Sequence, residues 1–105
     1  MAPADFKIEK MNRNESRKLI RKIVSTTPQK VFFSKHALSE LAKDDLTTID
    51  ALNVLKSTDA KVPDKGELEH GSYRYRLETA NIVVVICFSN NGEQLIVVTA
   101  WDKRK

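Results

Sequence analysis

Two arginines separated by one residue are the side chains of this sequence best suited to holding a phosphate. Arg74 and Arg76 alternate with Tyr73 and Tyr75, so in a β-strand both arginines project from one face, about 7 Å apart. Parallel guanidinium groups suit a phosphodiester, because each donates two N–H groups in a planar fork. The alternative is a solvated strand face whose charge is balanced by the acids of residues 59–69. The tyrosines, on the opposite face, are expected in the core.

A histidine in the first turn of a predicted helix is the candidate general base. Ser34 is a typical helix N-cap, which places His36 near the helix N-terminus. The positive end of the helix dipole favours neutral imidazole, the form that accepts a proton. The competing interpretation is a surface histidine packed against Glu40, one helical turn away. Lys35, beside the histidine, either adds a phosphate contact or is simply solvated.

The end of the sequence holds the candidate RNA-binding residues. Thr99 and Trp101 fall on one face of a predicted last strand, and Lys103, Arg104 and Lys105 follow it. An aromatic side chain can stack on a base and a basic tail attracts phosphates, so both features fit nucleic-acid binding. The alternatives are a tryptophan at the edge of the core and a tail that serves only solubility.

The sequence argues against metal and cofactor chemistry. His36 and His70 are the only histidines and are far apart, so a zinc site is not expected. Cys87 lies within the most apolar segment, where a buried thiol is a poor nucleophile, and a lone cysteine excludes an intramolecular disulfide. The three glycines are too scattered for a phosphate-binding loop. We therefore expect no metal and no cofactor.

Length and composition predict one domain over residues 1–105, with a frayed segment at residues 1–12. Hydrophobic residues make up 41% of the chain, which suffices for one small core. The longest apolar run, residues 82–88, is far shorter than the roughly 20 residues of a membrane span. The first residues lack the pattern of a signal peptide, so we expect a cytoplasmic protein with no membrane partner.

The net charge of +4 is distributed unevenly. Residues 1–30 hold eight Lys or Arg and three acids, whereas residues 36–72 hold four Lys and eight acids. Residues 73–105 are basic again, with five Lys or Arg and three acids. If the two ends meet in space they form one positive face, which suits an anionic partner. The alternative is that these charges lie on the solvated faces of ordinary helices.

Apolar spacing predicts three helices in the first half of the chain. The first covers residues 15–25 with Asn14 as its cap, the second follows Ser34 and ends near Lys43, and the third covers residues 48–56 after a Thr-x-x-Asp capping box. The residues expected to face the core are Leu19, Ile20, Ile23 and Val24, then Ala37, Leu38, Leu41 and Ala42, and then Ile49, Leu52 and Leu55.

Most strands are predicted in the last third of the chain. Residues 57–71 form a polar loop with room for a short edge strand, and Asn90-Asn91-Gly92 is a strong hairpin turn. Helices followed by an antiparallel meander predict an α+β domain of two layers, with N-terminal helices packed on a C-terminal antiparallel sheet. The predicted strands are residues 30–34, 73–79, 82–88 and 95–101.

These groups together fit metal-free RNA cleavage. In that reaction the 2′-hydroxyl of the substrate attacks the adjacent phosphate, so the protein supplies only a base, an acid and cations. Arg74 and Arg76 would hold the phosphate, His36 would move a proton, and Lys35 or Lys103 would add positive charge. The alternative function is a non-catalytic module of the same fold that binds RNA or a protein through its basic face.

Several short motifs, taken in order, resemble a family of small bacterial type II toxins related to MqsR, HigB and BrnT. The sequence VFFSKHA, followed by EL, is similar to an F-S-K-H-A-x-x-E-L opening motif of that family. The resemblance covers roughly residues 30–102 and depends on the order and spacing of its motifs. The similar segments are residues 31–37, 40–41, 45–51, 73–76 and 97–101.

The resemblance implies a RelE-like fold and a toxin of a type II toxin–antitoxin system. Such toxins are mRNA endoribonucleases that act on or off the ribosome, and an antitoxin encoded beside them keeps them inactive. In MqsR-like systems the antitoxin carries a helix-turn-helix domain, so the toxin would reach operator DNA only through its antitoxin. The positions that match the family motifs are Lys35, His36, Arg74, Arg76 and Thr99.

Overall fold

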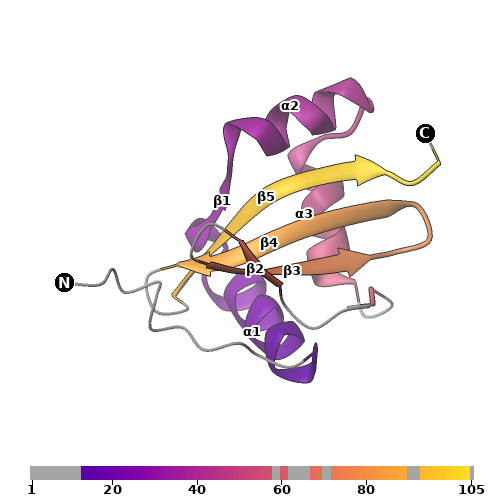
Figure 1. The fold of residues 1–105 in the computed structure, drawn as a ribbon. Helices are drawn as coiled ribbons and strands as arrows, with labels where there is room; N and C mark the ends of the chain where they lie inside the picture. The colour runs from indigo at the N-terminus through magenta and orange to yellow at the C-terminus, as the bar shows by residue number, and fades with distance from the viewer. Residues whose placement is uncertain (1–12, 58–59, 62–66, 70–71, 90–92, 105) are drawn as a thin grey trace.

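The chain folds as helices packed on one β-sheet, an α+β arrangement that confirms the predicted fold class (Figure 1). This computed structural model describes residues 13–57, 60–61, 67–69, 72–89 and 93–104. The predicted frayed segment, the turn at residues 90–92, His70 and Lys105 lie outside them. The elements are α1 (Arg13–Thr26), the 3₁₀ helix η2 (Pro28–Lys30), β1 (Val31–Phe33), α2 (Lys35–Lys43), α3 (Thr48–Lys56), β2 (Glu67–Glu69), β3 (Ser72–Glu78), β4 (Ile82–Ser89) and β5 (Gln94–Asp102).

The described strands form a sheet in the order β1-β5-β4-β3-β2. The strands β2 to β5 pair antiparallel with their neighbours, but β1 pairs parallel with β5, with Phe32 opposite Ile96. The sheet is therefore mixed, and the prediction of an antiparallel sheet is wrong at this edge. The physical reason is connectivity, because β1 reaches β5 only through two helices and three strands, and parallel pairing requires such a long crossover.

The helix ends follow local sequence signals. The Ser34 hydroxyl accepts a hydrogen bond from the backbone N–H of Ala37 at 3.0 Å, which confirms Ser34 as the N-cap of α2. Thr47 and Asp50 form the predicted capping box at the start of α3. The prediction of Asn14 as the N-cap of α1 is wrong, because α1 is described from Arg13 and Asn14 lies within the helix.

The core lies between α1 and α3 on one side and one face of the sheet on the other (Figure 1). Tyr75 and Leu77 of β3 point into it, as their alternation with the arginines predicts. Of the helices that the structure describes, none is long and apolar enough to cross a membrane. The other buried members of the core are Ile20, Ile23, Val24, Ala37, Leu41, Ala51, Val54, Leu55, Ala60, Val84, Ile86, Phe88, Leu95, Val97 and Ala100.

Three residues predicted to face the core are exposed. Leu38 and Ala42 of α2 lie on the surface, and Ile49 of α3 is 65% exposed. The reason for the first two is the position of α2, which packs along the edge of the sheet at β5 and so buries only Ala37 and Leu41. In α3 the buried face is formed by Ala51, Val54 and Leu55, which leaves Ile49 in its first turn outside.

Hydrogen bonds at both ends of α2 hold this helix along β5. At its start, the Ser34 backbone N–H donates to the Val97 carbonyl at 3.0 Å, and the Ser34 hydroxyl donates to the Val98 carbonyl at 2.8 Å. At its end, the Asp102 backbone N–H donates to Asp44 Oδ2 at 2.8 Å. The two stretches match in length, since ten helical residues and five strand intervals both span roughly 15 Å. Helix α2 thus covers the part of the β5 edge that β1 leaves unpaired.

Candidate functional site

The predicted site residues from the strands lie on the face of the sheet opposite α1 and α3, which we call the open face. Arg74 and Arg76 of β3 point to it because Tyr75 and Leu77 between and beside them point into the core. The register carries the same face across β4 to β5, where Thr99 lies opposite Val85. The other open-face positions are Phe32, Glu78, Val83, Cys87, Ile96 and Trp101.

The two arginines differ in their surroundings. Arg76 is exposed, and its guanidinium carbon lies 5.6 Å from the centroid of the Trp101 ring, a cation–π contact that crosses β4 diagonally. Among the described residues no carboxylate forms an ion pair with Arg76. Arg74 is half-buried between the flanking strands β2 and β4. Arg76 therefore presents a positioned guanidinium whose N–H edge is available to a phosphate.

Thr99 and Trp101 share the open face, as the sequence predicts. Both are half-buried, and their register partners on β4 are Val85 and Val83. Cys87 is buried on the same face, in agreement with the prediction that its thiol is not accessible. The open face is therefore an apolar floor with an aromatic ring and a cation at its surface, a combination suited to bases and phosphates of single-stranded RNA.

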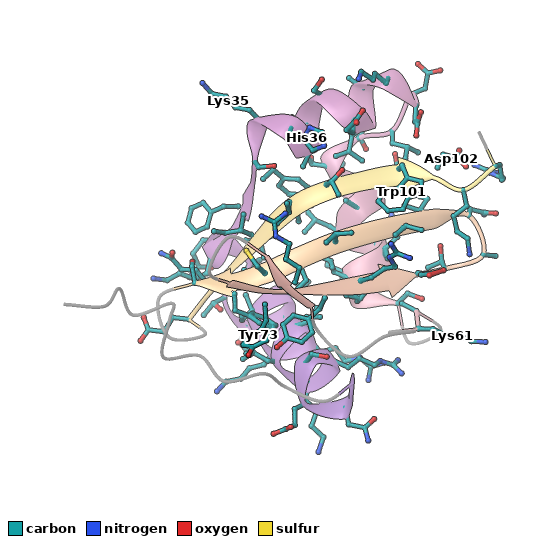
Figure 2. The ribbon with its side chains drawn as sticks, in the orientation of Figure 1. Lys35, His36, Lys61, Tyr73, Trp101 and Asp102 are labelled. Carbon is teal, nitrogen blue, oxygen red and sulfur yellow. The ribbon has the colours of Figure 1, made fainter. Side chains whose placement is uncertain are left out.

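His36 lies in the first turn of α2, at the side of the sheet. Its side chain is 65% exposed and its Nε2 lies 3.7 Å from Glu40 Oε1, so the predicted packing of His36 against Glu40 is confirmed. Glu40 also pairs with Lys43 at 3.2 Å. Lys35 is exposed and points away from the sheet (Figure 2).

The structure does not bring His36 into contact with Arg76. The bonds of Ser34 to β5 place the start of α2 beside Val98, whereas Arg76 lies two strands further in, roughly 10 Å from β5. Within the described residues, no hydrogen bond, ion pair or ring contact links the histidine to Arg76. One phosphate cannot touch both groups as they stand, but an RNA chain that crosses the sheet from β3 to α2 passes both.

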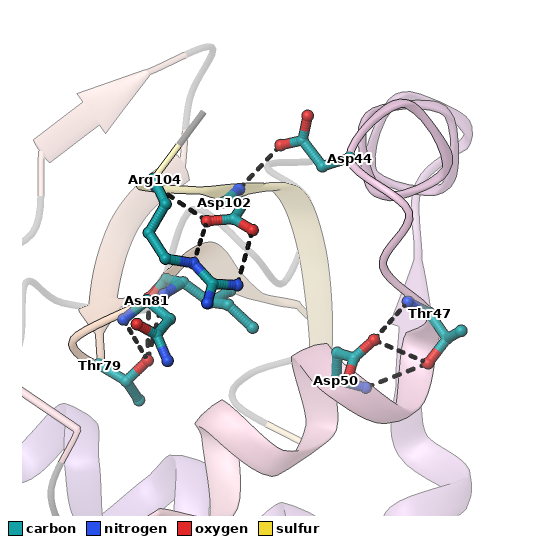
Figure 3. A network of polar contacts seen from close by, with 8 residues as sticks. Asp44, Thr47, Asp50, Thr79, Asn81, Asp102 and Arg104 are labelled. Atoms are coloured by element: carbon teal, nitrogen blue, oxygen red, sulfur yellow. Dashed lines mark hydrogen bonds and ion pairs between the residues drawn. The ribbon is translucent and has the colours of Figure 1, made fainter.

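Lys103 and Arg104, predicted to bind RNA, are both paired with acids (Figure 3 shows the arginine). Lys103 Nζ lies 3.2 Å from Glu78 Oε1. Arg104 donates from Nε to Asp102 Oδ1 at 3.0 Å and from Nη2 to Oδ2 at 2.9 Å. These hydrogen bonds, together with the attraction between the charges, raise the pKa of Arg104. The positive charges of Lys103 and Arg104 are therefore largely neutralised by Glu78 and Asp102, which the composition of the tail does not indicate.

Neither a cluster of metal ligands among the described residues nor a sequence relative defines the site further. Among the residues that the structure describes, no three His, Cys, Asp or Glu side chains are grouped so that they can hold a metal ion. The chain matches no protein-family model, and no curated protein is significantly similar to it in sequence. The resemblance to type II toxins therefore stays a prediction from short motifs.

Sequence reasoning missed the contact that distinguishes the site, the cation–π contact between Arg76 and Trp101. The two residues are far apart in sequence, and they meet only because β3, β4 and β5 pair in a particular register. That register includes a shift between Val85 and Ile86, which leaves Val98 as an extra residue in β5. Alternation along each strand predicts which face of the sheet a residue lies on, but it does not predict which residue of the next strand lies beside it.

Proposed function

We propose that the open face binds single-stranded RNA and that the protein is a metal-independent mRNA endoribonuclease, the toxin of a type II toxin–antitoxin pair. The observation that carries the RNA part is the exposed Arg76 in cation–π contact with Trp101 above an apolar floor. A guanidinium held over an indole ring by a cation–π contact keeps its N–H donors positioned for a phosphate, and the planar group can also stack on a base. The motif resemblance supports the toxin part.

Cleavage would need only the RNA, water and the side chains already described. The 2′-hydroxyl oxygen attacks phosphorus, its proton passes to a base, and the bond from phosphorus to the 5′ oxygen breaks as that oxygen gains a proton from water. Arg76 and Arg74 would stabilise the charge on the phosphoryl oxygens. His36 would be the base only if the bound RNA draws α2 toward β3, because the base must reach the 2′-hydroxyl beside the same phosphate. The products are a 2′,3′-cyclic phosphate and a 5′-hydroxyl.

The proposed partners follow from this function. The substrate is mRNA, free or on the ribosome, and the regulator is an antitoxin with a helix-turn-helix domain encoded beside the protein. The compartment would be the bacterial cytoplasm. The feature of the chain that favours such partners is the pair of cationic stretches, which attract phosphates and acidic protein surfaces alike.

A second candidate function is non-catalytic RNA binding through the same face. It is favoured by the surroundings of His36, which is exposed, contacts Glu40 and does not touch Arg76. In this case the protein would hold RNA without breaking it. The two functions share the contact at Arg76 and differ in the role of His36.

The test is a cleavage assay with purified protein, labelled mRNA and EDTA, with and without ribosomes. We expect products with 2′,3′-cyclic phosphate ends, at least roughly a tenfold loss of rate for Arg76→Ala from the missing charged hydrogen bonds, and no growth arrest when this variant is expressed. Arg104→Ala is the matched control, because it removes the same charge from an arginine already paired with Asp102. Binding without cleavage in both settings supports the second function, and full activity of a folded Arg76→Ala protein excludes Arg76 from the site.

A further inference from the structure

A second cationic surface lies on α1, in the layer on the other side of the sheet from the open face (Figure 1). Lys18, Arg21 and Lys22 of α1 are exposed, and Lys56 at the end of α3 is exposed beside them. We call these four residues the α1 surface. Among the described residues, no ion pair neutralises any of them, whereas Lys43, Lys103 and Arg104 are each paired.

The positive charges of the α1 surface are crowded. Lys18 lies three and four positions before Arg21 and Lys22, so the three side chains are neighbours on the helix and repel one another. Such a helix is less stable than one with mixed charges, and a bound polyanion would relieve the repulsion.

The surface is also hollowed around Arg21. A cavity of ≈ 290 Å³ lies between Arg21, Val24, Ser25 and Lys56. A second cavity, of ≈ 250 Å³, is lined by Arg21 together with Asn14, Arg17 and Lys18. Concave surfaces lined by one sign of charge concentrate the electrostatic field, so anionic groups are drawn into them. Arg21, which lines both cavities, is at the centre of this field.

The side chains around the charges indicate which polyanion fits. The exposed residues of α1 are polar or charged, and the apolar residues Ile20, Ile23 and Val24 are buried in the core. A membrane surface is therefore disfavoured, since Leu19, the one apolar residue in the described part of α1 that is partly exposed, packs against the core. Unstacked bases are disfavoured as well, because the described part of α1 has no aromatic residue.

We infer that the α1 surface binds a nucleic-acid duplex through its phosphate backbone, independently of base sequence. The contacts of a Lys and Arg surface without base-reading groups are to phosphates, and two paired strands present the densest array of them. The inference does not rest on the activity proposed for the open face. A protein with both surfaces can hold the stem of a folded RNA on α1 while the sheet holds an unpaired segment.

The test measures binding of the full chain to a blunt RNA duplex over a range of salt concentrations. We expect the double variant Arg21→Gln/Lys22→Gln to bind the duplex at least roughly tenfold more weakly at 0.1 M salt, and the slope of log K against log salt to fall by about two. The matched control is the single variant Lys43→Gln, compared with Arg21→Gln alone. It removes the same charge from a lysine paired with Glu40 and leaves duplex binding nearly unchanged. Duplex DNA should bind about as well as duplex RNA.

Three results overturn the inference. The first is an equal loss in Arg21→Gln and Lys43→Gln, which would show that only net charge matters. The second is a wild-type affinity that does not depend on salt, and the third is binding to vesicles containing phosphatidylserine but not to duplex. The melting temperature separates binding from folding, because removing crowded cations leaves it unchanged or raises it. Arg76→Ala should keep duplex binding, so the failure of the open-face function and the failure of this one are distinguishable.

Discussion

At the scale of single residues, the structure separates arginines that look alike in the sequence. Arg76 forms a cation–π contact with Trp101 and has no acid partner among the described residues, whereas Arg104 forms a two-bond ion pair with the buried Asp102. The guanidinium of Arg76 can still bind a ligand, whereas the guanidinium of Arg104 is bound to Asp102 at the end of β5. An arginine that is already paired with a buried acid is therefore a weaker candidate for binding a phosphate than one without such a partner.

Asp102→Ala is expected to destabilise the fold more than Arg104→Ala. The Asp102 carboxylate accepts hydrogen bonds from the backbone N–H of Arg104 at 2.8 Å as well as from its side chain, and its own side chain is 5% exposed. Losing these bonds should lower the free energy of unfolding by about 1–3 kcal/mol in urea denaturation. The side chain of Arg104 is 62% exposed, so its removal should cost less. Equal losses would show that the backbone bond contributes nothing.

At the scale of elements, α2 is the part whose position shapes the site. It packs on the edge of β5 through Ser34 and Asp44, and this places His36 at the side of the open face rather than above it. The same placement leaves Leu38 on the surface. The position of α2 therefore determines how an RNA chain can reach the histidine.

Ser34→Ala is expected to loosen α2 and lower stability. The substitution removes both the N-cap hydrogen bond to Ala37 and the bond to the Val98 carbonyl, so the free energy of unfolding should fall by about 1–2 kcal/mol in urea denaturation. Ser39→Ala is the control, because Ser39 is exposed within the same helix and alanine is a better helix former. A loss for Ser39→Ala as large as that for Ser34→Ala would contradict this role of the cap.

Local signals in the sequence predicted the ends of α2 and α3 and the faces of the strands, and these are confirmed. They failed for β1, whose parallel pairing with β5 depends on the path of the whole chain. They also failed for Ile49, because an apolar residue at helical spacing points to the core only when the helix presents that side to it. Within the candidate site, alternation along the strand predicted that Arg74 and Arg76 share a face. Which side chains lie beside them depends on how the strands are paired, and the sequence did not show that register.

At the scale of the whole molecule, the described residues carry cations on two surfaces with different chemistry. The open face combines a cation with an aromatic ring and an apolar floor, whereas the α1 surface carries cations alone. The expectation of one positive face formed by both ends is therefore replaced by two, one on each side of the sheet. Single strands are expected on the first and duplexes on the second.

Trp101 is the only tryptophan of the sequence, so its fluorescence reports directly on the open face. We expect single-stranded RNA to change Trp101 emission with the same midpoint as binding measured by anisotropy, and blunt duplex RNA to leave the emission unchanged. Arg76→Ala should weaken the single-strand titration by roughly ten- to a hundredfold, while Arg104→Ala should leave it nearly unchanged. Single-stranded RNA that binds without changing Trp101 emission, or that binds Arg76→Ala as tightly as the wild type, would contradict the proposed open-face site.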